Sequence, residues 1–204
     1  VLRIPVRGRS DVRCVRSSAD VKQWVCSGPP SVDAARPGRC PGCGAASRET
    51  GRGLTLHGHG LRPRTVFTRV GDQTMIVEIL ARRYLCLACA AVVLVLPADV
   101  ARRHLYTRIV IASALAQWSH GGLPASAVRG RFGAFAIRGH AATGWPSLRR
   151  WVLSARLLWS RLRRSADGPP HQLAHRVSVQ LAAFAPLSSG HVLDDAVTGA
   201  VHAA

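Results

Sequence analysis

The chain has 204 residues, of which 48% are hydrophobic, and its 28 Lys and Arg residues against 10 Asp and Glu residues give a formal net charge of +18. This apolar content excludes a wholly disordered chain, and the length allows one domain or two small ones. So large an excess of positive charge indicates a polyanionic partner.

Residues 1–35 predict an irregular basic arm. The first 36 residues hold six arginines, Lys22 and a turn-forming stretch at residues 27–31, so we expect them to pack loosely. The N-terminus shows no apolar targeting core. The longest apolar run, Leu85–Leu96, has twelve residues, whereas a bilayer span needs about 20. We therefore expect a cytoplasmic, nucleoid-associated protein that does not bind membranes.

Two Cys-x-x-Cys pairs, Cys40 with Cys43 and Cys86 with Cys89, are separated by 42 residues. A two-residue spacing turns both sulfurs of a pair toward one point, and two such knuckles complete a tetrahedral thiolate site. A thioredoxin-like redox pair is the alternative, but it requires one motif beside a βαβ pattern, which the sequence lacks. We predict a structural Zn²⁺ site in a zinc ribbon of residues 36–98.

Other metal-ligating side chains are fewer and less well placed. His57 and His59 lie between the knuckles and are alternative ligands, but with four thiolates available we expect surface or DNA-facing histidines. Cys14 and Cys26 are interpreted as plain thiols.

A β-hairpin is predicted between the knuckles. Two β-rich runs, Val66–Val70 and Gln73–Ile79, flank a Gly71-Asp72 turn. Such a small sheet buries little, so the metal should supply much of its stability. Arginines near the hairpin are candidate phosphate contacts or solvated positions, with neither favoured: Arg62, Arg64, Arg82 and Arg83.

Helical periodicity begins after Pro97 and predicts a helix-turn-helix-like unit of three helices within residues 99–165. The first helix contains Leu105, Ile109 and Ala112, and the second runs from Ala125 to about Phe132. The third opens near residues 144–147, and its apolar positions continue to Leu162. About a dozen residues separate the second and third helices, whereas the usual turn takes about 3–4.

The helical segment is strongly basic. Between Val100 and Ala166 there are twelve arginines and no acidic residue. A helix that is apolar on one face and basic on the other suits a phosphate backbone or a major groove; a solvated basic helix is the alternative. The candidate DNA contacts are Arg149, Arg150, Arg156, Ser147, Arg163 and Arg129.

The last segment, residues 166–204, is predicted to be a flexible or loosely packed tail. It is rich in Gly, Pro, Ser and Ala and holds four of the nine histidines. A short helix over Val177–Phe184 is the alternative.

No catalytic motif is apparent. Two-metal nucleotidyl transfer requires clustered carboxylates, and the ten acidic residues are dispersed along the chain. No phosphate-binding loop, nucleophile elbow or zinc-protease motif is present. We therefore expect a protein that is not an enzyme.

Several residues together resemble the zinc-binding N-terminal region of bacterial insertion-sequence transposases and related stand-alone small zinc-binding proteins. The resemblance rests on the two knuckles, His57-Gly58, Arg82-Arg83-Tyr84 and Pro97, and its helix-turn-helix part on residues 144–151. It covers about residues 36–164. In transposases these parts recognise terminal repeats, and a separate downstream domain with an acidic triad cuts DNA. The forty residues after 164 leave no room for such a domain, so the resemblance implies DNA binding without cleavage.

The sequence therefore predicts an α+β protein that combines a zinc ribbon with a helical unit that binds duplex DNA. Two other functions remain open. The chain is alternatively an adaptor that binds an acidic protein, such as a transposase or another recombination protein. An RNA-binding module is the third hypothesis, but the hairpin offers only Phe67 and Tyr84 for stacking on bases.

Overall fold

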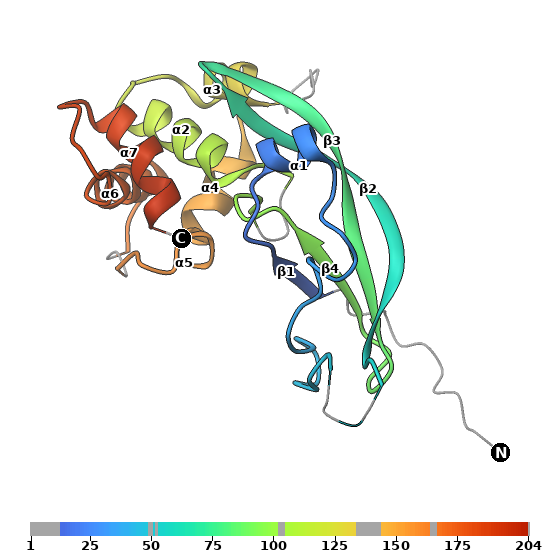
Figure 1. Ribbon diagram of the computed structural model, residues 1–204. Coiled ribbons are helices and arrows are strands. Elements are labelled where there is room, and N and C mark those ends of the chain that lie inside the picture. Colours follow the sequence, from blue (N-terminus) through green and yellow to red (C-terminus); the bar gives the residue numbers. More distant parts are fainter. Residues whose placement is uncertain are drawn as a thin grey trace. The chain divides into compact units, whose positions relative to one another are not determined.

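The computed structural model describes residues 13–48, 51, 53–101, 105–133, 144–163 and 167–203. The chain divides into two compact units, one of residues 1–65 and 78–98 and one of residues 66–77 and 99–204. The protein is mixed α+β, with a four-stranded sheet, a helix between the first two strands of the chain and further helices after the last strand (Figure 1). No helix of the described part is long and apolar enough to cross a bilayer.

The sheet has the strand order β1-β4-β3-β2. Strands β2 (Leu56–Val70) and β3 (Gln73–Cys86) form the predicted hairpin, with Gly71 at a φ of 59° in the turn between them. The hairpin is confirmed, and both strands extend well beyond the predicted runs. Strand β4 (Val92–Leu96) pairs antiparallel with β3 through residues 82–85 and is mostly buried.

The expectation of an irregular arm is wrong for the part of residues 1–35 that the structure describes. Strand β1 (Arg13–Arg16) pairs in parallel with β4, and helix α1 (Val21–Ser27) follows it. Asp20 and Gln23 form a reciprocal capping box that starts this helix, and α1 buries Val21 and Trp24. A four-residue strand is too short to give a clear periodic signal. Its partner strand lies about eighty residues away in the chain, so the nearby sequence does not predict the pairing either. Residues 1–12 lie outside the described part.

The first two predicted helices are present in the second unit. Helix α2 (Arg108–Ser119) is buried at every position from Val110 to Ala116, and α3 (Ala125–Phe132) has the predicted bounds. The predicted connection of residues 133–144 falls mostly on residues outside the described part.

The third predicted helix is not continuous. It divides at Ser154 into α4 (Pro146–Leu153) and α5 (Ala155–Leu158), and the chain becomes extended at Trp159. The predicted apolar positions are nevertheless buried, from Leu148 to Leu162. Burial of this face therefore does not require one straight helix.

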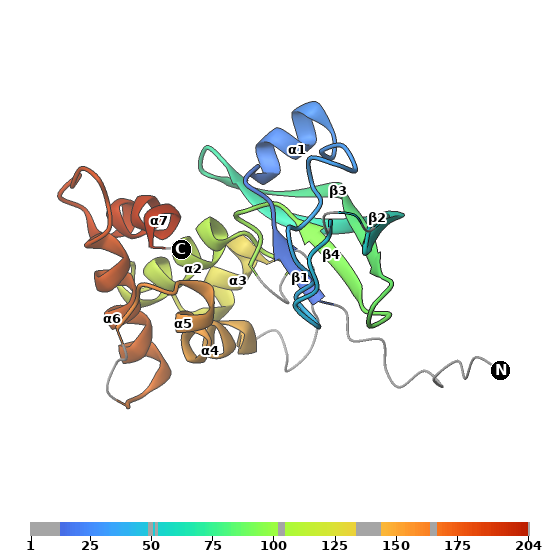
Figure 2. The same cartoon turned by 60° about the horizontal axis from the view of Figure 1, so that its bottom comes forward.

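The predicted loose tail is also wrong for the described residues. Helices α6 (Pro170–Ala182) and α7 (Val192–His202) lie beside α2 in both views (Figures 1 and 2). Ala174, Leu181, Ala196 and Ala200 are fully buried. A helix that is apolar on every side, as α2 is, must be covered on every side; the tail provides this cover.

Candidate metal centre

The two Cys-x-x-Cys motifs adopt the same local hydrogen-bonding pattern. In the first, the Cys40 N–H donates to the Ala45 carbonyl and the Gly44 N–H donates to the Cys40 carbonyl, both at 2.8 Å. In the second, the Cys86 N–H donates to the Ala91 carbonyl at 3.0 Å, and the Ala90 N–H donates to the Cys86 carbonyl at 2.8 Å. Because the hydrogen bonds join residues at the same sequence separations in both motifs, the two knuckles have equivalent backbone structures.

Each knuckle ends in a residue with left-handed backbone conformation, which directly follows its second cysteine. Gly44 has a φ of 76°, and the equivalent Ala90 has a φ of 57°. Ala90 is the one non-glycine residue with positive φ in the described chain. The left-handed conformation costs an alanine about 1 kcal/mol, so the second knuckle keeps its shape against a local backbone preference.

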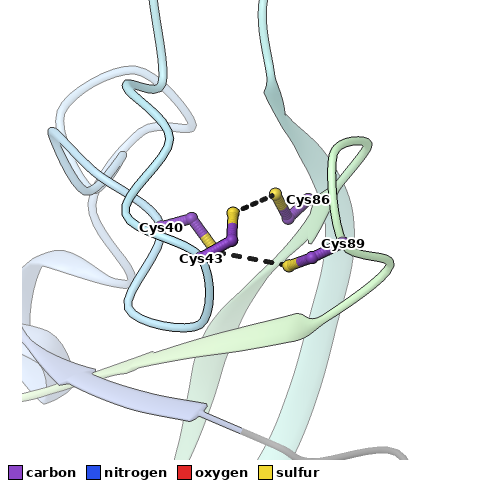
Figure 3. A group of neighbouring side chains, drawn as sticks. All are labelled: Cys40, Cys43, Cys86 and Cys89. Atoms are coloured by element: carbon purple, nitrogen blue, oxygen red, sulfur yellow. Dashed lines mark hydrogen bonds between the residues drawn. The ribbon is translucent and has the colours of Figure 1, made fainter.

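The four sulfurs converge on one point (Figure 3). The Cys40 and Cys89 sulfurs are 3.8 Å apart and those of Cys43 and Cys86 are 3.7 Å apart, and all four lie within 4.8 Å of one another. A disulfide requires about 2.05 Å, so these are separate thiols. Four sulfurs bound at about 2.3 Å in a tetrahedron lie about 3.8 Å apart. The arrangement thus fits a metal ion held by four thiolates.

The first cysteine of each knuckle is buried and the second is exposed. Cys40 and Cys86 are 1% and 0% exposed, whereas Cys43 and Cys89 face solvent. The buried pair belongs to the apolar cluster of the first unit together with Leu56. Two of the four candidate metal ligands are therefore also part of that unit's core.

The pKa values of Cys40, Cys86 and Cys89 are shifted in different directions. Burial opposes ionisation of Cys40, but hydrogen bonds from the N–H groups of Cys43 and Gly42 outweigh it and lower its pKa to about 7. Burial and the neighbouring sulfurs raise the pKa of Cys89 to about 12. Burial also raises the pKa of Cys86. Neighbouring thiolates repel one another, so a bound cation would favour the ionised form of the clustered thiols.

Hydrogen bonds connect the segments that surround the two knuckles. The Leu87 N–H donates to the Thr55 carbonyl at 2.9 Å, which ties the second knuckle to the residue before β2. The guanidinium of Arg36 donates to the Leu56 carbonyl. The hydroxyl of Tyr84, which is fully buried, donates to the Val32 carbonyl at 2.6 Å. Segments distant in sequence are thereby joined beside the cysteines.

The other candidate ligands lie outside this cluster. His57 and His59 are exposed, and the His57 ring contacts the Leu54 carbonyl at 2.6 Å. Cys14 lies in β1 and Cys26 is exposed on α1. Among the residues that the structure describes, the four cysteines are the one group with metal-ligand geometry.

The predicted DNA-contact residues divide between the two units. In the second unit Arg149, Arg150, Arg156 and Arg163 are exposed, and the half-buried Ser147 hydroxyl accepts a bond of 3.2 Å from Arg150. Arg129 must be withdrawn as a DNA contact. It is only 7% exposed, and it donates to the Gly144 carbonyl at 3.4 Å.

The arginines of the hairpin region differ in exposure. Arg62 is exposed, whereas Arg64, Arg82 and Arg83 are half-buried. The Arg82 Nε atom donates to the Pro30 carbonyl at 2.7 Å, so this side chain ties the segment after α1 to β3. Arg131 is also exposed, in the last turn of α3.

Comparisons with protein-family models, with curated proteins and with solved structures found no match to this chain.

Proposed function

We propose that the chain is a transposon-associated protein that uses structural zinc to hold its first unit and binds duplex DNA without cleaving it. The observation that carries this proposal is the exposed arginine surface of α4 and α5 and the residues that follow, in a segment without acidic residues. The likeness of the knuckles and of residues 144–151 to insertion-sequence transposases supports the transposon association.

Zinc is the metal that the ligand set supports best. Tetrahedral four-thiolate sites hold zinc or iron, and a zinc site closed by four protein ligands is structural rather than catalytic. The four cysteines fill all four positions, which leaves none for a reacting water. Zinc bound here would join the loop before β2 to the end of β3 and the loop before β4.

The arginine surface of α4 and α5 is suited to phosphate. Where acidic residues are within reach, arginines of this protein pair with them, as Arg36 and Arg48 do with Asp33 at 2.9 Å. Within the described residues, Arg149, Arg156 and Arg163 make no such ion pair. An exposed guanidinium can bind a phosphate in a bidentate manner. The dispersal of the ten acidic residues supports binding without cleavage.

One observation favours the adaptor function as a second candidate. Leu153 and Leu157 are 67% and 79% exposed among these arginines. Exposed leucines beside positive charge fit an amphipathic helix of an acidic partner. On DNA, the same leucines would contact thymine methyl groups in the major groove.

The test measures binding of a labelled 20-base-pair duplex by fluorescence anisotropy at two salt concentrations. Arg156→Gln is compared with Arg48→Gln, which removes the same charge from an arginine already paired with Asp33. We expect Arg156→Gln to weaken binding about tenfold and to reduce the salt slope by about 1. Arg48→Gln should change the affinity less than twofold.

Other results would reject the proposal. An equal loss of DNA affinity in the Arg156→Gln and Arg48→Gln variants would indicate that the DNA is attracted by net charge alone. Tighter binding to a matched RNA would favour the RNA-binding hypothesis, and binding to an acidic helical peptide but not to DNA would favour the adaptor. Elemental analysis that finds no metal in the purified protein would reject the zinc site independently.

A further inference from the structure

An apolar groove of about 420 Å³ opens on the second unit between the end of α2 and the starts of α4 and α6. Six of the residues that line it matter here: Trp118, Trp145, Pro146, Pro170, His171 and Arg149. Trp118 and Trp145 are half-buried, so part of each indole is open to solvent, and His171 is exposed. The volume lies in the range of sites that bind small organic groups.

The aromatic walls of the groove are held in place. The rings of Trp118 and His171 meet edge to face with centroids 5.3 Å apart, and a His171 nitrogen lies 3.0 Å from the Trp118 carbonyl. Trp145 packs edge to face against Trp151 at 4.7 Å and Tyr106 at 6.1 Å. Rings that are already ordered lose little conformational entropy when a ligand stacks on them.

The charge at the groove favours an anionic ligand. Arg149 lines the groove, and none of the described residues that line it is acidic. Arg149 belongs to the same helix as Arg150, whose side chain faces solvent. The aromatic walls and Arg149 fit a ligand that has a flat aromatic group next to a negative charge. A nucleotide, with its base and its phosphate, is such a ligand.

We propose that this groove receives an unpaired nucleobase of a bound DNA, stacked against Trp118, with Arg149 contacting a flanking phosphate. The inference rests on the proposed DNA-binding function and adds a preference for DNA with an unpaired end or mismatch. Stacking on an aromatic side chain tolerates any base, because every base has a π-face. The duplex would be bound through the arginine surface, and the unpaired base would enter the groove.

The experiment compares a blunt duplex with the same duplex carrying a three-nucleotide overhang that contains 2-aminopurine. We expect the overhang to increase affinity and stacking to quench the 2-aminopurine emission. Trp118→Ala should abolish the quenching and lower affinity for the overhang duplex about 5- to 100-fold, while affinity for the blunt duplex changes less than twofold. Trp118→Phe should restore most of both effects, because it keeps an aromatic face.

A matched histidine pair controls for indirect effects. His171→Ala should weaken binding of the overhang duplex, whereas His191→Ala, which alters an exposed histidine at the start of α7, should not. Blunt-duplex binding without a preference for the overhang would overturn the groove proposal and leave the proposed function intact. Absence of binding to either duplex would reject both. Quenching of tryptophan fluorescence by a proline-rich peptide, with no response to the overhang, would assign the groove to a protein ligand instead.

Discussion

We expect the two units of this protein to be stabilised by different means. In the first unit, Cys40 and Cys86 of the candidate metal site belong to a buried apolar cluster that also contains Leu56, Tyr84 and Val93. The cluster of the second unit includes Trp151, Trp159 and Leu115, each at most 1% exposed, and it contains described residues from each of the helices α2 to α7. We expect metal–sulfur bonds to supplement the apolar core of the first unit, whereas the described residues of the second unit pack around a larger apolar core.

The largest expected effect comes from removing a cysteine ligand. Cys86→Ala should abolish metal binding and unfold the first unit, because structural zinc contributes about 10 kcal/mol or more to such sites. Hydrogen exchange measured by mass spectrometry should show loss of protection in β4 and retained protection in α2. Cys26→Ala, which changes an exposed cysteine outside the cluster, should leave both unchanged. If β4 kept its protection from hydrogen exchange without metal, the first unit would not depend on metal for its stability, and the expected difference between the units would be wrong.

The next largest effect should come from the close approach of α6 and α7. A Cβ atom on Gly199 would overlap the Leu181 carbonyl oxygen and lie 3.1 Å from the Ala185 nitrogen. Gly199→Ala should therefore destabilise the second unit by about 3 kcal/mol without changing the zinc content. Urea unfolding, monitored by circular dichroism, measures this change in the free energy of unfolding. Gly130→Ala, where a Cβ meets nothing within 4 Å, should be neutral or stabilise α3 by about 0.5–1 kcal/mol.

A smaller effect depends on pH. The Ser188 hydroxyl at 2.6 Å and the Ser189 N–H at 2.7 Å hold the pKa of Asp195 below its usual value of 3.8. Because the native pKa is lowered, the stabilisation is complete above about pH 4 and is lost as pH falls through the native pKa. Asp195→Asn should lower the urea midpoint at pH 7, and the difference from the wild type should shrink at pH 2.5. The exposed neighbour provides the control: Asp194→Asn should change the pH 7 midpoint much less.

The smallest effect tests the equivalence of the two knuckles. Ala90→Gly should relieve the left-handed strain and tighten zinc binding about fivefold, since that conformation costs a non-glycine residue about 1 kcal/mol. Gly44→Ala should weaken binding by a similar factor, because a Cβ there meets nothing within 4 Å and only the backbone conformation matters. Competition with a chelator measures both. If the two substitutions moved affinity in the same direction, the knuckles would not be equivalent.

Much of the site was predictable from local sequence. A Cys-x-x-Cys spacing constrains the directions of two sulfurs over four residues, so the ligand set Cys40, Cys43, Cys86 and Cys89 required no knowledge of the rest of the fold. The hairpin and the helix of Ala125–Phe132 were predictable for the same reason, since turn residues and short-range periodicity specify them.

The errors occurred where partners lie far apart in sequence. Strand β1 exists because residues 93–96 pair with it, and Arg129 is buried because the second unit folds around it. The tail looked disordered because alanines and glycines are poor indicators of a core. In the structure Gly199 and Ala200 are buried because they let α7 approach α6 closely. The apolar character of α2 on every side was the sequence signal that more helices had to cover it.

The sequence by itself determined the four cysteines of the candidate metal site, the hairpin, the basic character of the helical segment and the face of residues 148–162 that is buried. These are properties of neighbours in the chain, which spacing and periodicity report directly. Only the tertiary structure decided which arginines reach solvent, that β1 joins the sheet, that the third helix divides at Ser154, and that Trp118 and Trp145 line one groove. Those outcomes depend on which surfaces are left uncovered when distant segments pack together, and a one-dimensional pattern does not contain that information.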